Sequence, residues 1–108
     1  MKNGGQTVFV KVGAVDYIEA ASNYAILHTE TGNHVVRETL VNLESKLSPK
    51  QFRRISRSVM ANLERVREIR ADGQGDHVVV LHSGQQLSLT RNVHEMINML
   101  QFPGNAGQ

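Results

Sequence analysis

The chain has 108 residues, a formal net charge of +2 and 40% hydrophobic residues, which fits a single domain with a modest core. It contains no cysteine, which excludes disulfides and thiolate metal sites and suits a reducing compartment. No apolar run approaches the roughly 20 residues of a membrane helix, and the N-terminus lacks the apolar stretch of a signal peptide. We therefore expect a soluble, cytoplasmic protein.

Positive charge is concentrated in one part of the chain. The segment 50–70 has a net charge of +5, whereas the remainder has a net charge of −3. A basic segment on a near-neutral scaffold favours contact with a polyanion. A solvated face of paired charges would produce the same pattern, so the two interpretations stay open at this point.

Most of the chain has the pattern of short strands separated by turn residues. The turns are marked by polar pairs and by glycines, as in Ser22-Asn23, Glu30-Thr31-Gly32 and Ser83-Gly84. In chain order, the expected strands are Thr7–Val12, Val15–Ala20, Tyr24–Thr29, Asn33–Arg37, Phe52–Ser56, Val66–Ala71, His77–Leu81 and Gln86–Thr90.

A short helix is expected in the middle of the chain. Leu40, Leu43 and Leu47 lie on one apolar stripe at helical spacing. Thr39 is a suitable N-cap, and the pair Ser48-Pro49 ends the helix. The stripe predicts a helix packed against the strands.

A second helix is expected near the C-terminus. Asn92 is a candidate N-cap, and Glu95 can complete a capping box three residues later. Pro103-Gly104 then ends the helix. The apolar residues recur at positions i, i+3, i+4 and i+7 and are Val93, Met96, Ile97 and Leu100.

The residues predict neither an enzyme nor a metal site. No serine lies in a Gly-x-Ser-x-Gly context, no glycine-rich phosphate loop is present, and the carboxylates are scattered. His28 and His34 are symmetric about Thr31, so a tight hairpin there would place them opposite each other. The sequence supplies no third ligand at a known metal spacing. We expect no cofactor and interpret these histidines as solvent-facing strand residues.

Side chains that suit DNA contacts gather at three junctions between elements. Arginines neutralise phosphates or read guanine bidentately, and hydroxyl and amide groups bond phosphate oxygens. The first junction offers Ser22 and Asn23, and the last offers Arg91 and Asn92. The middle one, within nine positions, has Arg54, Ser56, Arg57, Ser58 and Asn62.

The order and spacing of these motifs resemble the LytTR family of DNA-binding domains. The resemblance runs from about Val8 to Leu100. Its most specific part is the segment 52–58, Phe-Arg-Arg-Ile-Ser-Arg-Ser, followed by Asn62. The segments 15–24, 36–40 and 84–91 also fit the family. Ser56 stands where the family often has His, and Ala61 replaces the usual Val.

The resemblance implies an elongated, mainly β fold made of small antiparallel sheets, with one short internal helix and a C-terminal helix. Family members insert loops into successive major grooves, and most have an N-terminal receiver domain that is absent here. We therefore expect residues 7–101 to form the DNA-binding domain, between flexible ends at 1–6 and 102–108. We also expect a monomer in solution and two copies on duplex DNA with spaced half-sites.

Roles can be assigned to the candidate residues on this basis. Arg57 and Arg91 would read bases, with help from Asn23 and Tyr24. Ser56 would occupy the position of a polar contact. The residues expected to position the DNA backbone are Arg54, Ser58, Asn62 and Asn92. Two of these, Arg54 and Asn62, could instead brace the turn between strands.

Other functions fit the residues less well. A small β module could use the same surface to bind an acidic protein partner, without preference among duplex sequences. A single-strand RNA binder needs exposed aromatic platforms, and only five phenylalanine and tyrosine residues are present. The sequence thus favours a transcription regulator's DNA-binding domain.

Overall fold

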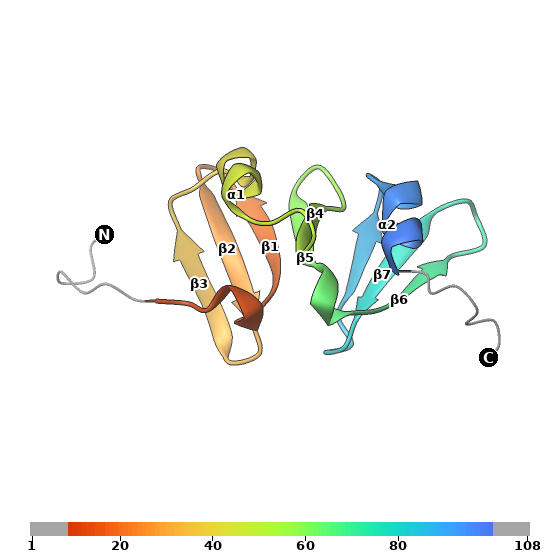
Figure 1. Cartoon of the computed structure of the whole chain (residues 1–108), viewed down its shortest axis with the longest axis horizontal. Helices are drawn as coiled ribbons and strands as arrows, with labels where there is room; N and C mark the ends of the chain where they lie inside the picture. Colours follow the sequence, from red (N-terminus) through yellow and green to blue (C-terminus); the bar gives the residue numbers. More distant parts are fainter. Residues whose placement is uncertain (1–8, 101–108) are drawn as a thin grey trace.

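The computed structural model describes residues 9–100, which form two antiparallel sheets and two α-helices (Figure 1). The molecule measures 53 × 25 × 24 Å, so the expected elongated, mainly β architecture is confirmed. In chain order the elements are η1 (Val12–Ala14), β1 (Val15–Ala21), β2 (Tyr24–Thr29), β3 (Gly32–Val36), α1 (Leu40–Lys46), β4 (Phe52–Arg54), β5 (Val59–Asn62), η2 (Leu63–Arg65), β6 (Val66–Ala71), β7 (His77–Leu81), β8 (Gln86–Leu89) and α2 (Val93–Leu100).

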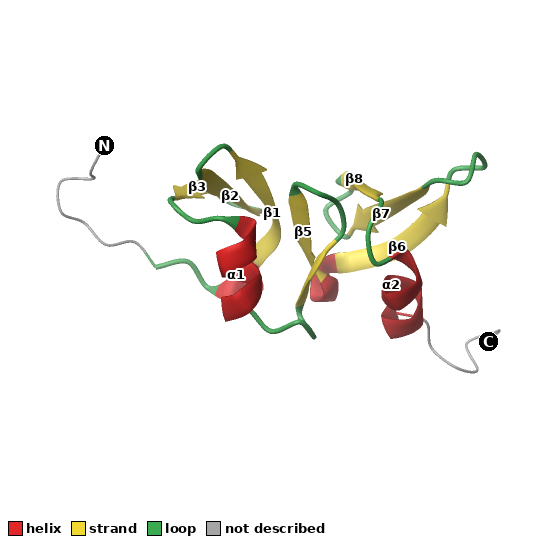
Figure 2. Cartoon of the chain, turned by 90° about the horizontal axis from the view of Figure 1, so that it is seen from above, coloured by secondary structure: helices red, strands yellow, loops and turns green. Residues whose placement is uncertain are grey.

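The first sheet has five strands in the order β3-β2-β1-β5-β4. Helix α1 covers one of its faces (Figure 2). The side chain of Thr39 accepts a hydrogen bond from the Asn42 amide at 3.1 Å, which confirms the predicted N-cap. The core between this sheet and α1 consists of Val15, Ile18, Ala25, Leu40, Phe52 and Met60.

The second sheet has three strands in the order β6-β7-β8, and α2 packs against it. Its core joins residues of both sheets to the helix, so the two halves of the molecule share buried apolar surface. The buried members of this core are Ile55, Ala61, Leu63, Val79, Leu81, Leu89 and Met96.

Strand β5 connects the two cores and was not predicted from the sequence. It pairs with β1 and β4, and its side chains alternate between the two sides of the sheet. Met60 therefore belongs to the core beneath α1, whereas Ala61 belongs to the core beneath α2. With only four residues and flanking polar groups, this segment lacks the length of a typical strand signal.

The expected strand Thr7–Val12 is not formed over its described part. Residues 9–11 are irregular, and Val12 begins a 3₁₀ turn. Val10 packs against the core beneath α1, but Val12 is 43% exposed, so the alternating valines do not form one buried sheet face. Alternation predicts a strand only where a partner strand is available to pair. The flexible ends expected at 1–6 and 102–108 lie outside the described residues.

Within residues 9–100, no helix is long and apolar enough to cross a membrane. The remaining expected strands and both helices are present, and the bounds that the structure describes lie within two residues of those expected; the helix end expected at Pro103-Gly104 lies outside the described residues. Phe52–Ser56 is the strand that is shortened most, because the amides of Ile55 and Ser56 already turn back to the carbonyl oxygen of Val59.

Candidate nucleic-acid interface

The strand order brings two of the three polar junctions to the same end of the first sheet. Ala21 pairs with Tyr24 across the β1–β2 turn, and Glu19 pairs with Val59 at the start of β5. The amide of Ala20 donates to the carbonyl oxygen of Ser58 at 2.8 Å. The β1–β2 turn and the β4–β5 loop therefore lie side by side.

The third junction is bound to the β4–β5 loop. The amides of Thr90 and Arg91 both donate to the carbonyl oxygen of Ile55, at 2.7 and 3.1 Å. The side-chain amide of Asn92 donates to the carbonyl oxygen of Arg54 at 2.7 Å. These bonds join segments more than 30 residues apart in the sequence, so the backbone positions of Arg57 and Arg91 are fixed within one structural unit.

An ion pair extends this connection to the body of α2. Nη2 of Arg53 on β4 lies 2.7 Å from Oε1 of Glu95. Glu95 therefore pairs with a neighbouring strand instead of completing a capping box with Asn92. Asn92 itself has a left-handed φ of 57°, and its side chain is directed to Arg54, so the predicted side-chain cap of α2 is wrong. Its carbonyl oxygen still accepts the amide of Met96 at 2.8 Å.

The nine candidate residues divide into two groups by exposure. Ser56 and Asn92 are half-buried, and Arg54 and Asn62 are buried. The exposed candidates, which are free to meet a ligand, are Asn23, Tyr24, Arg57, Ser58 and Arg91.

Arg54 closes the base of the β4–β5 loop from inside. Its Nη2 donates to the carbonyl oxygen of Arg57 at 2.6 Å, and its Nε donates to that of Ser56 at 3.4 Å. Nη1 lies 3.5 Å from a carboxylate oxygen of Glu44 on α1. With 8% of its surface exposed, Arg54 is occupied in shaping the loop and is not presented to solvent.

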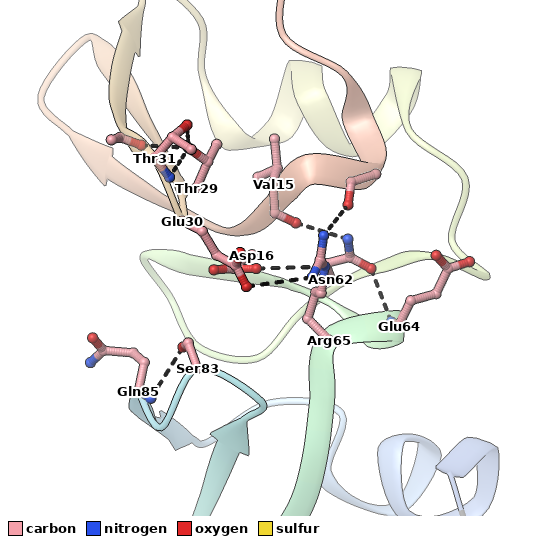
Figure 3. A network of polar contacts seen from close by, with 12 residues as sticks. Val15, Asp16, Thr29, Glu30, Thr31, Asn62, Glu64, Arg65, Ser83 and Gln85 are labelled. Carbon is pink, nitrogen blue, oxygen red and sulfur yellow. Dashed lines mark hydrogen bonds and ion pairs between the residues drawn. The ribbon is translucent and has the colours of Figure 1, made fainter.

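Asn62 is fully buried where β5 meets η2 (Figure 3). Its Nδ2 donates to the carbonyl oxygen of Val15 at 2.8 Å, and its Oδ1 accepts the amide of Glu64 at 2.9 Å. Both functions of the amide are thus used within the fold. The geometry fits the bracing interpretation of Arg54 and Asn62 and leaves no exposed surface of Asn62 for direct contact.

The histidines do not face each other as the sequence suggested. The hairpin turns through Glu30 and Thr31 alone, because Thr29 pairs with Gly32. This register places His28 opposite Asn33 and His34 opposite Leu27. No group of three or more potential metal ligands occurs among the described residues.

His28 has a structural environment of its own. Its ring stacks on Tyr17 with centroids 4.1 Å apart, and its Nε2 lies 2.9 Å from Oε1 of Glu19. Burial, followed by the nearby carboxylate of Glu19, raises the pKa of Tyr17. These contacts account for the position of His28 on the strand pair without a ligand, so this half-buried histidine is not the solvent-facing residue expected from the sequence.

Ion pairs neutralise much of the positive charge of the basic segment 50–70. Five of its six arginines pair with carboxylates from outside the segment or within it: Arg53, Arg54, Arg65, Arg67 and Arg70. Arg67 and Arg70 share Glu68, and the hydrogen bond from Arg70 is the largest cause that lowers the pKa of that carboxyl. Most of the local charge excess is therefore neutralised within the fold.

The positive charges that stay unpaired lie both inside and outside this segment. Among residues 9–100, the basic side chains without an ion pair are Lys11, Arg37, Lys50, Arg57 and Arg91. Arg57 and Arg91 belong to the joined junctions described above. Arg37 follows β3 directly and was not among the predicted candidates, because only the pairing of Val36 with Ala25 places it at the same end of the sheet. The available signal was a basic residue at the very end of the expected strand Asn33–Arg37.

Comparison with known proteins identifies the family. The model of the LytTr DNA-binding domain family matches residues 5–101, so the chain belongs to this family of DNA-binding domains. It is similar in fold to a LytTr DNA-binding domain from Bacillus cereus, with a TM-score of 0.79 at 20% identity over 94% of both chains.

Two curated relatives are longer than this chain. The CO-responsive transcriptional regulator RcoM of Rhodospirillum rubrum is 36% identical over 77 residues, which are 71% of this chain and 33% of the relative. The sensory transduction protein LytT of Bacillus anthracis is 25% identical over 93 residues, or 86% of this chain and 38% of the relative. The chain spans about a third of the length of these proteins.

Proposed function

We propose that the chain is the sequence-specific output domain of a bacterial transcription regulator, with duplex DNA as its ligand. The observation that carries the proposal is the joined pair of junctions. Two exposed, unpaired arginines, Arg57 and Arg91, project from loops that are hydrogen-bonded to each other at Ile55. Such an arrangement fixes the backbone positions from which the two side chains extend before any ligand binds, which reduces the cost of ordering the loops on DNA.

Each site residue has a role in this proposal. Arg57 and Arg91 read base edges, and Asn23 and Tyr24 contribute from the neighbouring β1–β2 turn. Ser58 and Ser56 bond phosphates at the margin of the loop. The supporting residues, which hold the loops in place from within, are Arg54, Asn62 and Asn92.

We further propose that residues 7–101 form the DNA-binding unit and that a regulatory domain, such as a receiver, controls it in the complete regulator. The match of the family model to residues 5–101 and the greater length of the relatives support this organisation. In this proposal the domain itself acts in the cytoplasm and has neither a cofactor nor catalytic activity of its own. Two copies would occupy spaced half-sites.

The dependence of binding on salt tests the proposal. If the domain neutralises several phosphates, the logarithm of its affinity for duplex DNA should fall linearly with the logarithm of the salt concentration. Selection from random duplexes, followed by fluorescence anisotropy at several salt concentrations, would measure both the preferred site and the slope. Enrichment of a spaced repeat and a steep slope are expected. A flat slope without enrichment would favour a module that binds an acidic protein instead.

A further inference from the structure

We propose that Arg37 is a phosphate-binding residue of the same DNA interface and anchors the flank of the base-reading loops. The inference rests on the proposed function, because it assigns a further residue to the same ligand. Arg37 is exposed and directly follows β3, in the connection that leads to α1.

The sheet register places Arg37 at the end of the strands where the other candidate contact residues lie. Val36 pairs with Ala25, and Tyr24 pairs with Ala21, so β3 ends beside the β1–β2 turn. Figure 1 shows the β3–α1 connection and the β4–β5 loop at the same, upper side of the molecule. Residues 37 and 57 therefore lie at the same end of the first sheet, one beyond β3 and the other before β5.

The separation of the two arginines suits a phosphate contact. Three interstrand steps separate β3 from β5 in the strand order, which corresponds to about 14 Å at the usual strand spacing. The major groove of B-DNA is about 12 Å wide. When Arg57 is inserted among the bases, a residue about 14 Å away across the strands lies outside the groove, over the sugar–phosphate backbone. Arg37 thus meets phosphates and not base edges.

The local electrostatics favour an anion at Arg37. The next residue, Glu38, would repel a phosphate, but its carboxylate pairs with Nζ of Lys46 at 2.7 Å. The hydrogen bond from Lys46 is the largest of the interactions that lower the pKa of Glu38. Arg37 itself forms no ion pair and no side-chain hydrogen bond with the described residues, so its five donors are free.

The fold does not depend on Arg37. Thr39, not Arg37, caps α1, and the backbone bond from Glu38 to Val36 is independent of the side chain. Replacement of an exposed side chain without partners typically changes stability very little. Arg37→Ala and Arg37→Gln are therefore expected to fold like the parent domain.

Lys50 provides a matched control. It is also exposed and unpaired, but it lies two residues before Phe52, which pairs with Asn62 at the opposite end of β5. Lys50→Ala removes the same charge from the opposite end of the strands. Any difference between the two variants then reports position and not net charge.

Binding of the two variants to the selected duplex and to random duplexes tests the inference. Arg37→Ala should weaken binding to both by about 3- to 10-fold at low salt and reduce the salt slope by about 0.9, the value for one phosphate contact on B-DNA. Arg37→Lys should restore most of the slope, whereas Lys50→Ala should leave it unchanged. Ethylation interference should show the loss of one phosphate outside the bases that are read.

The possible failures are distinguishable. If the parent domain shows no salt-dependent duplex binding, the proposed function and the inference both fail. If the parent binds but Arg37→Ala behaves like Lys50→Ala, the inference alone is overturned. A loss confined to the selected duplex with an unchanged salt slope would also overturn it, since Arg37 would then read a base.

Discussion

Burial separates residues that can touch DNA from residues that hold the contact loops. In the sequence, Arg54 and Arg57 are three positions apart in the same motif and carry the same chemistry. In the structure, the guanidinium group of Arg54 is turned inward to the carbonyl oxygen of Arg57, while Arg57 itself is exposed. One arginine therefore positions the other.

Substitution of the exposed arginines should affect binding and not stability. If each reads a guanine, Arg57→Ala and Arg91→Ala should each cost about 1–3 kcal/mol on the selected duplex and much less on random DNA. Thermal melts should shift little, because both side chains lack partners in the described fold. Equal losses on both duplexes would identify phosphate contacts, and a large fall in melting temperature would make the residues structural.

The buried arginine should respond in the opposite way. Arg54→Ala leaves the carbonyl oxygens of Ser56 and Arg57 without their donor. We expect a loss of about 1–3 kcal/mol in the free energy of unfolding, since lost hydrogen bonds to a charged group are costly. Urea denaturation measures this loss, and Arg70→Ala, at an exposed arginine on β6, serves as the control. Unchanged stability with weakened DNA binding would return Arg54 to the contact residues.

The residue types at the site could be predicted from the sequence, but their orientation could not. Arg57, Ser58 and Arg91 are exposed at junctions, as expected. The inward direction of Arg54 and Asn62 depends on acceptors at Arg57 and Val15, one of them 47 positions away. No local pattern records such a partner, so the two possible roles of these residues could not be separated from the sequence.

Secondary-structure elements could be predicted from the sequence where the apolar pattern is long. The prediction failed where contacts with distant segments determine the local structure. Helix α2 follows from its apolar spacing alone. Strand β5 does not, because its four residues become a strand only by pairing with β1 and β4 on either side. Asn92 has the residue type of an N-cap, yet its backbone is left-handed. Its side-chain amide donates a hydrogen bond to the carbonyl oxygen of Arg54 on β4 instead.

Two substitutions at Asn92 separate its backbone from its side chain. Asn92→Gly keeps the left-handed φ available and removes only the bond to Arg54, so it should cost about 1 kcal/mol. Asn92→Ala adds the penalty of a left-handed β-carbon, about 1 kcal/mol more. Chemical denaturation of both variants gives the difference. Equal stability of the two variants would show that the left-handed φ of residue 92 does not reduce the free energy of unfolding.

The whole molecule is held in its extended shape by contacts between the two sheets. The second core includes Ala61 from the first sheet. Arg65, in the turn between the sheets, donates to the carbonyl oxygen of Gly13 at 2.9 Å and pairs with Asp16 and Glu30 (Figure 3). The long axis of 53 Å exceeds one helical turn of B-DNA, about 34–36 Å. One molecule lying along the duplex is thus long enough to reach two successive major grooves.

This shape predicts the footprint and stoichiometry of the complex. At about 3.4 Å per base step along one strand, 53 Å corresponds to about 16 base pairs for a molecule lying lengthwise, whereas its 25 Å width corresponds to about 7. We expect hydroxyl-radical protection of about 16 base pairs on a single half-site. The sequence has no heptad seam, so sedimentation should show a monomer without DNA, a 1:1 complex on one half-site and a 2:1 complex on a repeat. A tight dimer in the absence of DNA, or protection of only about 7 base pairs, would contradict a monomer that lies along the helix. In the case of a dimer, the exposed residues of α2, among them Met99, would be the first candidates for the contact.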